Sequence, residues 1–321
     1  MKAKTFLARW GTVLAVPALY ILFSVLMPDT FMTPDNAVSI LRSISVVTII
    51  AVGLTISLAA GGFDLSVGSG ATLGGTVAMT CFVWYELGIV PSILIALLCS
   101  TLVGGTNALL SARLKIPDML ATLSAMFIFE GIATTYAGGG SVTESMSRMD
   151  GTPTNGTVPV IFKGLGRAPW VILIMLVVVL LAYLFLEHTK AGRCLYMVGG
   201  NSEAAYLSGI STAKFRTLAY LLCALLAALG GILLAARNGA AQIGAGGGLL
   251  MPAVAAAYIG FSFGGRGRAN ALGTLLGAAL IGVLENGLVM LSFPYYAVNI
   301  VKGGVLALAL ALTYVGRKQN G

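Results

Sequence analysis

The sequence predicts an all-α, polytopic membrane protein of about ten transmembrane helices, with residues 1–321 forming a single transmembrane domain. Hydrophobic residues make up 58% of the chain and charged residues only 9%, whereas a soluble domain carries about 25% charged residues. Glycine accounts for 42 of the 321 residues, and so large a share is typical of closely packed membrane helices. Most soluble enzymes and nucleic-acid-binding proteins are therefore excluded.

Ten apolar segments are long enough, or nearly so, to cross a bilayer core of about 30 Å, which takes about 20 helical residues. They are residues 11–27, 37–59, 68–86, 89–112, 119–137, 169–187, 217–236, 248–263, 269–291 and 294–315. No A-x-A cleavage site follows the first segment, so we expect a retained helix rather than a signal peptide. The eighth is too short for a straight span and is expected to be broken or tilted.

The basic residues flank these segments unequally. With the N-terminus in the cytoplasm, the inner segments hold Lys2, Lys4, Arg9, Arg113, Lys115, Lys190, Arg193, Lys214, Arg216, Arg266, Arg268, Arg317 and Lys318, and the outer segments only Arg148, Lys163, Arg167 and Arg237. Lys and Arg accumulate in cytoplasmic loops, so both termini are predicted to be cytoplasmic. These positions also argue against nucleic acid as the reason for the net charge of +8.

Two long polar segments remain between the apolar ones. Residues 138–168 are rich in Gly, Ser, Thr and Pro and are predicted to form an extracytoplasmic loop. Residues 187–216 lie on the cytoplasmic side. There Asn201 or Ser202 can cap a short helix, Glu203 favours its first turn, and Gly209 can end it. This helix is either a docking element or an amphipathic connector lying on the membrane.

Four charged residues fall well inside the apolar segments: Arg42, Glu130, Glu285 and Lys302. Each costs about 2.5–3.5 kcal/mol at a helix centre and therefore needs a partner or water. Glu285 lies nine residues before Pro294 and Lys302 eight after it, so a hairpin at Pro294 would bring the two side chains together. Arg42 and Glu130 fall at similar depth, but nothing makes their helices neighbours. Structural pairing and an ion or proton relay are both open for these four residues.

Local chemistry assigns no catalytic or metal site. The chain has a single histidine, His188, and its four cysteines form no C-x-x-C pair, which argues against the usual metal sites. No Gly-Lys dipeptide occurs, so a Walker A phosphate loop is excluded and the chain cannot hydrolyse ATP by that route.

Several blocks, in order along residues 37–315, resemble the ribose-type sugar permeases of binding-protein-dependent ABC importers. They are Gly61-Gly62-Phe63-Asp64-Leu65-Ser66-Val67-Gly68-Ser69, Lys115-Ile116-Pro117 with Ala121-Thr122-Leu123, Gly199-Gly200-Asn201 with Glu203-Ala204-Ala205 and Gly209, and Gly264-Gly265-Arg266-Gly267 with Gly273-Thr274-Leu275-Leu276-Gly277 and Asn286-Gly287-Leu288. Asp118, Met119, Leu120, Ser124 and Met251-Pro252-Ala253 depart from the pattern of that family.

The resemblance implies an ABC importer permease fold in the bacterial inner membrane and a transport subunit rather than an enzyme. Its substrate would be a monosaccharide (pentose or hexose) or a similar small polyol. ATP and Mg would be bound by a partner ATPase, not by this chain, and a periplasmic or lipid-anchored sugar-binding protein would deliver the substrate. A second copy of the chain, or a related permease, would complete the pathway.

The same resemblance implies that the 199–210 helix contacts the ATPase. The residues assigned to coupling are Gly199, Gly200, Asn201, Ser202, Glu203, Ala204, Ala205 and Gly209. The candidates for the pathway, or for structural roles beside it, are Asp64, Asn107, Glu130, Glu285, Asn286 and Lys302. Asp64 has a local alternative, since it can accept from the amides of Ser66 or Val67 after a turn at Gly61 and Gly62. Phe63 and Tyr258 are further candidates for sugar contact.

An ion- or proton-coupled secondary transporter of small solutes is the alternative. The embedded Glu130 and Glu285 and a broken eighth helix would suit it. The capped cytoplasmic helix argues against it.

Overall fold

The computed structural model describes residues 2–261, 267–294, 296–305 and 307. In this part of the chain the regular structure is helical, and β structure is limited to an isolated antiparallel bridge between Val142 and Ala241. The helices are α1 (Lys2–Leu26), α2 (Pro28–Phe31), α3 (Pro34–Ala59), α4 (Val67–Val83), α5 (Ile89–Asn107), the π-helix η1 (Ala108–Arg113), α6 (Asp118–Tyr136), α7 (Val160–Leu165), α8 (Trp170–His188), α9 (Lys190–Gly200), α10 (Ser202–Leu207), α11 (Thr212–Asn238), α12 (Gly247–Gly260) and α13 (Ala271–Met290). Residues 296–305 are also helical.

Six helices of the described part are long and apolar enough to cross a membrane. They are Pro34–Ala59, Ile89–Arg113, Asp118–Tyr136, Trp170–His188, Thr212–Asn238 and Ala271–Met290. Three shorter apolar helices accompany them: Leu14–Leu26, Val67–Val83 and Gly247–Gly260. The all-helical, multi-pass prediction is confirmed, whereas the count of ten is not. The tenth expected span, residues 294–315, lies partly outside the described residues.

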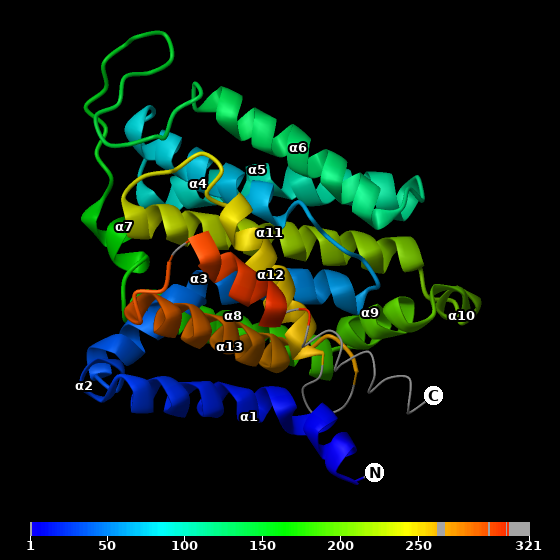
Figure 1. Ribbon diagram of the computed structural model, residues 1–321. Coiled ribbons are helices and arrows are strands. Elements are labelled where there is room, and N and C mark those ends of the chain that lie inside the picture. Colours follow the sequence, from blue (N-terminus) through cyan, green and yellow to red (C-terminus); the bar gives the residue numbers. More distant parts are fainter. Residues whose placement is uncertain (1, 262–266, 295, 306, 308–321) are drawn as a thin grey trace.

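Helix α11 is the centre of the bundle and packs against α3, α4 and α5 (Figure 1). Small residues allow the backbones to approach closely there. A Cβ atom on Gly104 of α5 would lie 2.6 Å from the carbonyl oxygen of Tyr220 on α11. One on Gly74 of α4 would lie 2.8 Å from the Cα atom of Ala228. The abundance of glycine therefore reflects helix contact around α11.

Two of the short helices, α4 and α12, begin near the middle of the bundle. At 1.5 Å per residue they are only about 25 and 21 Å long, less than the ~30 Å of a bilayer core. A Cβ atom on Gly70 in the first turn of α4 would lie 3.5 Å from the Cβ atom of Ala227, half-way along α11. Gly246, just before α12, donates its backbone N–H to Thr72 Oγ1 of α4 at 3.2 Å. The first turns of α4 and α12 therefore meet at mid-depth.

The expectation that residues 68–86 form a full span is therefore not confirmed, while the short eighth segment is short as expected. The hydropathy of the sequence cannot distinguish a short helix such as α4 from a full span, because a short helix buried in protein is equally apolar. Residues 60–66 and 239–246 are non-helical and lead from the ends of α3 and α11 to these first turns. Such backbone is tolerated in a membrane only where protein or an internal cavity surrounds it, and broken helices of this kind are typical of transporters.

The connections divide between the two ends of the bundle (Figure 1). The start of α1, α9 and α10 lie at one end, and α2, α7 and the long loop before α7 lie at the other. We call them the α10 end and the α7 end. This separation agrees with the placement of residues 138–168 and 187–216 on opposite sides of the membrane.

Candidate functional site

Helix α10 is a short capped helix, as the sequence predicts. The side chain of Asn201 accepts hydrogen bonds from the backbone N–H groups of Glu203 at 3.1 Å and Ala204 at 2.9 Å. Gly209 follows with a φ of +81°, a left-handed conformation that favours glycine. The capped helix and its glycine stop are therefore confirmed.

The α10 helix presents an apolar tip beyond the end of the bundle (Figure 1). Only Ala205 is buried, whereas Tyr206 is 69% exposed and Leu207 is 80% exposed. Ser202, Glu203 and Ala204 are exposed as well. Large apolar side chains on a projecting element are typical of a surface that contacts another molecule.

Helix α9 connects α10 to the break between α3 and α4. Thr189 caps α9 by accepting from the N–H of Gly192 at 3.0 Å. At the other end of α9, Gly199 packs directly on the turn that follows α3, where Gly61 has a φ of +75°. A Cβ atom on Gly199 would lie 2.3 Å from the carbonyl oxygen of Ala59. Only glycine fits this contact.

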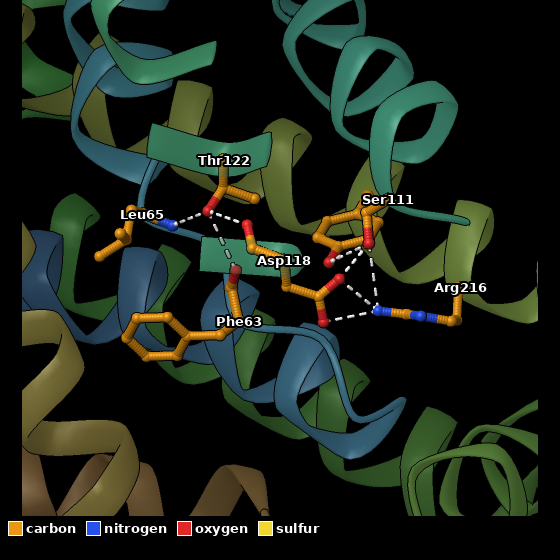
Figure 2. A network of polar contacts seen from close by, with 7 residues as sticks. Phe63, Leu65, Ser111, Asp118, Thr122 and Arg216 are labelled. Atoms are coloured by element: carbon orange, nitrogen blue, oxygen red, sulfur yellow. Dashed lines mark hydrogen bonds and ion pairs between the residues drawn. The ribbon is translucent and has the colours of Figure 1, made fainter. Parts of the chain in front are cut away.

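A network of hydrogen bonds and an ion pair contacts the segment between α3 and α4 from the side opposite α9, as Figure 2 shows. Arg216, near the start of α11, forms an ion pair with Asp118, the first residue of α6. Ser111 of η1 donates to the same carboxylate. One turn along α6, Thr122 Oγ1 accepts from the N–H of Leu65 at 3.1 Å and donates to the carbonyl oxygen of Phe63 or of Asp118. The network thus joins the starts of α6 and α11 to residues 63–65.

The sequence did not select Arg216 and Asp118 as a pair. Asp118 stood out only as a departure from the family pattern, and Arg216 only as one of the inner basic residues. A weak signal was present, because both charges begin a helix at the same predicted face. Nothing in the sequence places α6 beside the start of α11.

Asp64 lies at the centre of the break and is fully enclosed. Its carboxylate accepts from the N–H of Ser66 at 2.8 Å, from the Ser66 hydroxyl at 2.6 Å, and from Asn107 Nδ2 at 3.1 Å. Asp64 and Asn107 are 1% and 0% exposed. The predicted turn around Asp64 is confirmed, and Asn107 joins it. Both side chains are closed in, and Asn107 Nδ2 ties Asp64 and Ser66 together within the break.

Glu285 and Lys302 form an ion pair, with Lys302 Nζ 2.8 Å from Glu285 Oε1. The prediction that the chain turns at Pro294 and brings the two together is confirmed. Arg42 and Glu130 are not paired in the structure. Glu130 lies against Thr72 and Gly244, where α4 and the segment before α12 meet. Arg42 lies near Arg237 instead.

A cavity of about 330 Å³ adjoins the Glu285–Lys302 pair. We call it the α13 cavity. It is lined by Ser43, Ile44, Val47, Arg237, Gly248, Leu249, Pro252, Ala278, Ile281, Gly282, Glu285, Asn286, Val289 and Lys302. The remaining pathway candidates, Asp64, Asn107 and Glu130, do not line it.

The predicted aromatic candidates lie together elsewhere. The rings of Phe63 and Tyr258 are 6.0 Å apart, and Tyr258 stacks on Phe261 at 5.5 Å. In the described ranges, no three His, Cys, Asp or Glu side chains come together as a metal site would require.

Comparison with known proteins gives a match along nearly the whole chain. Residues 36–310 match the family described as the permease component of the branched-chain amino acid transport system. The ribose import permease protein of Escherichia coli K12 is 36% identical over 310 residues, covering 96% of this chain and 94% of that one.

Two further relatives are similar over comparable lengths. The ribose import permease protein of Haemophilus influenzae is 37% identical over 318 residues, covering 98% of this chain and 96% of the relative. The xylose transport system permease protein of Escherichia coli K12 is 27% identical over 359 residues, covering 95% and 91%. No solved structure matches the chain.

Proposed function

The chain belongs to the family of branched-chain amino acid transport system permease components, and from this we propose that it imports a monosaccharide, of the pentose or hexose class, or a similar small polyol. It is the transmembrane subunit of an ATP-driven ABC importer, a transport component and not an enzyme, and a multi-pass protein of the inner membrane. The observation that carries this is 36% identity to a ribose import permease over 96% of the chain.

The ATPase of the importer is a separate subunit, and α10 is the element that enters it. ATP and Mg are held there, since this chain has no Walker A loop. The exposed Tyr206 and Leu207 form the contact. Gly199, Gly200, Asn201, Ser202, Glu203, Ala204, Ala205 and Gly209 shape the helix and its flanks. The α10 end is then cytoplasmic, and so is the N-terminus.

Movement of α10 reaches the pathway at residues 60–66. Gly199 of α9 presses on the turn at Gly61. On the opposite side, the Arg216–Asp118 pair ties the start of α11 to α6, and Thr122 of α6 holds residues 63–65. Both connections start beside α10 and end at the break before α4. Closure of the ATPase therefore shifts the first turn of α4 relative to α12.

The transport cycle needs two such chains, either two copies of this one or this one with a related permease, to engage two ATPase subunits. A periplasmic or lipid-anchored binding protein delivers the sugar at the α7 end. Because that protein supplies the affinity, the membrane pathway can hold the sugar weakly. An ion- or proton-coupled carrier is not favoured, since Glu285 is held in an ion pair with Lys302 and the relatives that match the chain are ribose import and xylose transport permeases.

Sugar uptake into vesicles tests this proposal. The chain is reconstituted with its ATPase and binding protein, and entry of labelled pentose is followed with ATP inside or outside the vesicle. We expect uptake only where ATP reaches the ATPase, and no effect of a protonophore. Uptake that continues without ATP hydrolysis and collapses with the protonophore would support the secondary transporter instead.

A further inference from the structure

We propose that the α13 cavity is a monosaccharide-binding site in the outer half of the transport pathway, which rests on the importer function proposed above. The cavity lies between α3, α11, α12, α13 and the helix 296–305. Three of the predicted pathway residues line it, namely Glu285, Asn286 and Lys302. Arg237 and Ser43 also line it and were not predicted for the pathway.

The cavity lies in the half of the bundle that ends at the α7 end, where the proposed binding protein delivers the sugar. Arg237 is in the last turn of α11 and Glu285 is near the end of α13, and both of these helix ends lie at the α7 end. The cavity floor is formed by Gly248 and Leu249, in the first turn of α12, which begins at mid-depth. The cavity therefore lies between the mid-depth start of α12 and the α7 end of the bundle.

The size of the cavity fits one small ligand. Its volume of about 330 Å³ is at the lower end of small-molecule sites, which range over roughly 300–1,000 Å³. It corresponds to about ten waters, at ~30 Å³ of liquid volume each. A single sugar ring suits this volume better than a longer saccharide.

The polar groups of the cavity match the hydroxyls of a sugar. Glu285 offers carboxylate acceptors, and Lys302 offers ammonium donors. Asn286 Oδ1 is buried and has no hydrogen-bond partner among the described residues, so it is free to accept from a ligand. Arg237 adds a guanidinium group with no acidic partner in the described part of the chain. Sugar hydroxyls donate and accept at once, and these four side chains can satisfy both.

The other wall of the cavity is aliphatic. It is formed by Ile44, Val47, Leu249, Pro252, Ile281 and Val289. None of the described residues that line the cavity is aromatic, so they offer no stacking surface of the kind that tight sugar sites have. A site of this kind holds a sugar briefly and releases it, as a transport intermediate requires.

The first test removes the charges of Glu285 and Lys302 and keeps the size of both side chains. In Glu285→Gln/Lys302→Met the ion pair is replaced by neutral groups of similar size, a change that is often tolerated because no charge is left unpaired. The variant is assembled with ATPase and binding protein. We expect normal binding-protein-stimulated ATPase activity and at least a 5-fold fall in sugar molecules imported per ATP, which corresponds to about 1 kcal/mol.

Asn286→Ala has a control in Asn299→Ala, because Asn299 is exposed on the helix 296–305, which also carries Lys302, and does not line the cavity. We expect the first substitution to lower import per ATP and the second to leave it unchanged. If the double variant and Asn286→Ala both import sugar at the original ratio, the cavity is not the sugar site, although the importer function stands.

The second test detects the ligand directly. Ser43→Cys is introduced after Cys99 and Cys194, the two partly exposed cysteines, have been replaced by alanine. Labelling of Cys at position 43 by a water-soluble thiol reagent is measured with millimolar D-ribose or D-glucose, and with glycine betaine at equal osmolarity. We expect slower labelling with the sugars only. Ser147→Cys, in the outer loop, should label equally in all three solutions, and equal labelling at position 43 would overturn the proposal.

Discussion

Arg216, the fifth residue of α11, forms an ion pair with Asp118, the first residue of α6, and this pair stands between helix α10 and the break before α4. The two side chains are 25% and 18% exposed, so water screens them only in part. The pair lies where the proposed coupling movement would enter the helix bundle.

Removing one partner of this pair should uncouple transport. We expect Arg216→Gln or Asp118→Asn to lower sugar import per ATP by roughly 2- to 30-fold, the effect of a coupling energy of 0.5–2 kcal/mol. The measurement is uptake and ATP hydrolysis in the same vesicles. Arg268→Gln is the matched control, because its pair with Glu187 lies near the same end and does not touch residues 60–66. Restored import in the exchanged pair Asp118→Arg/Arg216→Asp would identify the charge contact itself, and unchanged coupling in all variants would refute its role.

Gly199 and its neighbour Gly200 give a second matched comparison. A Cβ atom at 199 would lie 2.3 Å from the Ala59 carbonyl oxygen, whereas one at 200 would meet nothing within 4 Å. Gly199→Ala should therefore destabilise the protein by about 1–3 kcal/mol, as overpacking does, and should reduce uptake. Gly200→Ala should do neither. Thermal unfolding in detergent and vesicle uptake give both readouts, and equal behaviour of the two variants would contradict this packing.

The tip of α10 should bind the ATPase through its apolar side chains. Leu207 is 80% exposed, so Leu207→Ser should leave the thermal stability of the isolated chain unchanged. We expect it to reduce copurification of the ATPase and ATP-driven uptake together. Val160→Ser, an equally exposed apolar position of α7 at the opposite end, should retain the ATPase. Loss of the ATPase in both variants would point to a general surface effect instead.

The outer loop contains a pH-sensitive contact between Glu144 and Lys163, 2.9 Å apart. The Lys163 ammonium and the N–H of Val158 lower the pKa of the Glu144 carboxyl below its ordinary value of 4.5. A carboxyl with a lowered pKa stabilises the folded loop above its unfolded pKa, and this stabilisation is lost as the pH falls through the folded value. The hydrogen-exchange protection factors of residues 138–168 should therefore fall below about pH 4.5, and Lys163→Met should weaken that dependence. An identical pH profile in the variant would contradict the assignment.

The sequence was sufficient to predict those contacts whose geometry is fixed by residues close together along the chain. The Glu285–Lys302 pair follows from a turn at Pro294 with nearly equal spacing on both sides, and the α10 cap follows from Asn201, Glu203 and Gly209. Both are local relationships. The composition was likewise sufficient to predict a membrane protein, because a chain with 9% charged residues cannot cover its surface with charge in water.

Contacts between distant helices could not be read in this way. Arg216 and Asp118 are 98 residues apart, and they are brought together because both α6 and α11 pack against η1. The mid-depth start of α4 was also missed, since residues 68–86 are as apolar as a full span. The α13 cavity combines five helices, so its sequence signal was limited to single polar residues.

Photo-crosslinking from position 207 tests the central claim, that the ATPase acts on this chain through α10. A photoreactive amino acid replaces Leu207 in the assembled importer, and crosslinks are identified with and without ATP. The account predicts a crosslink to the ATPase subunit that changes in yield with nucleotide. Crosslinks to lipid or to the binding protein, with none to the ATPase, would contradict it.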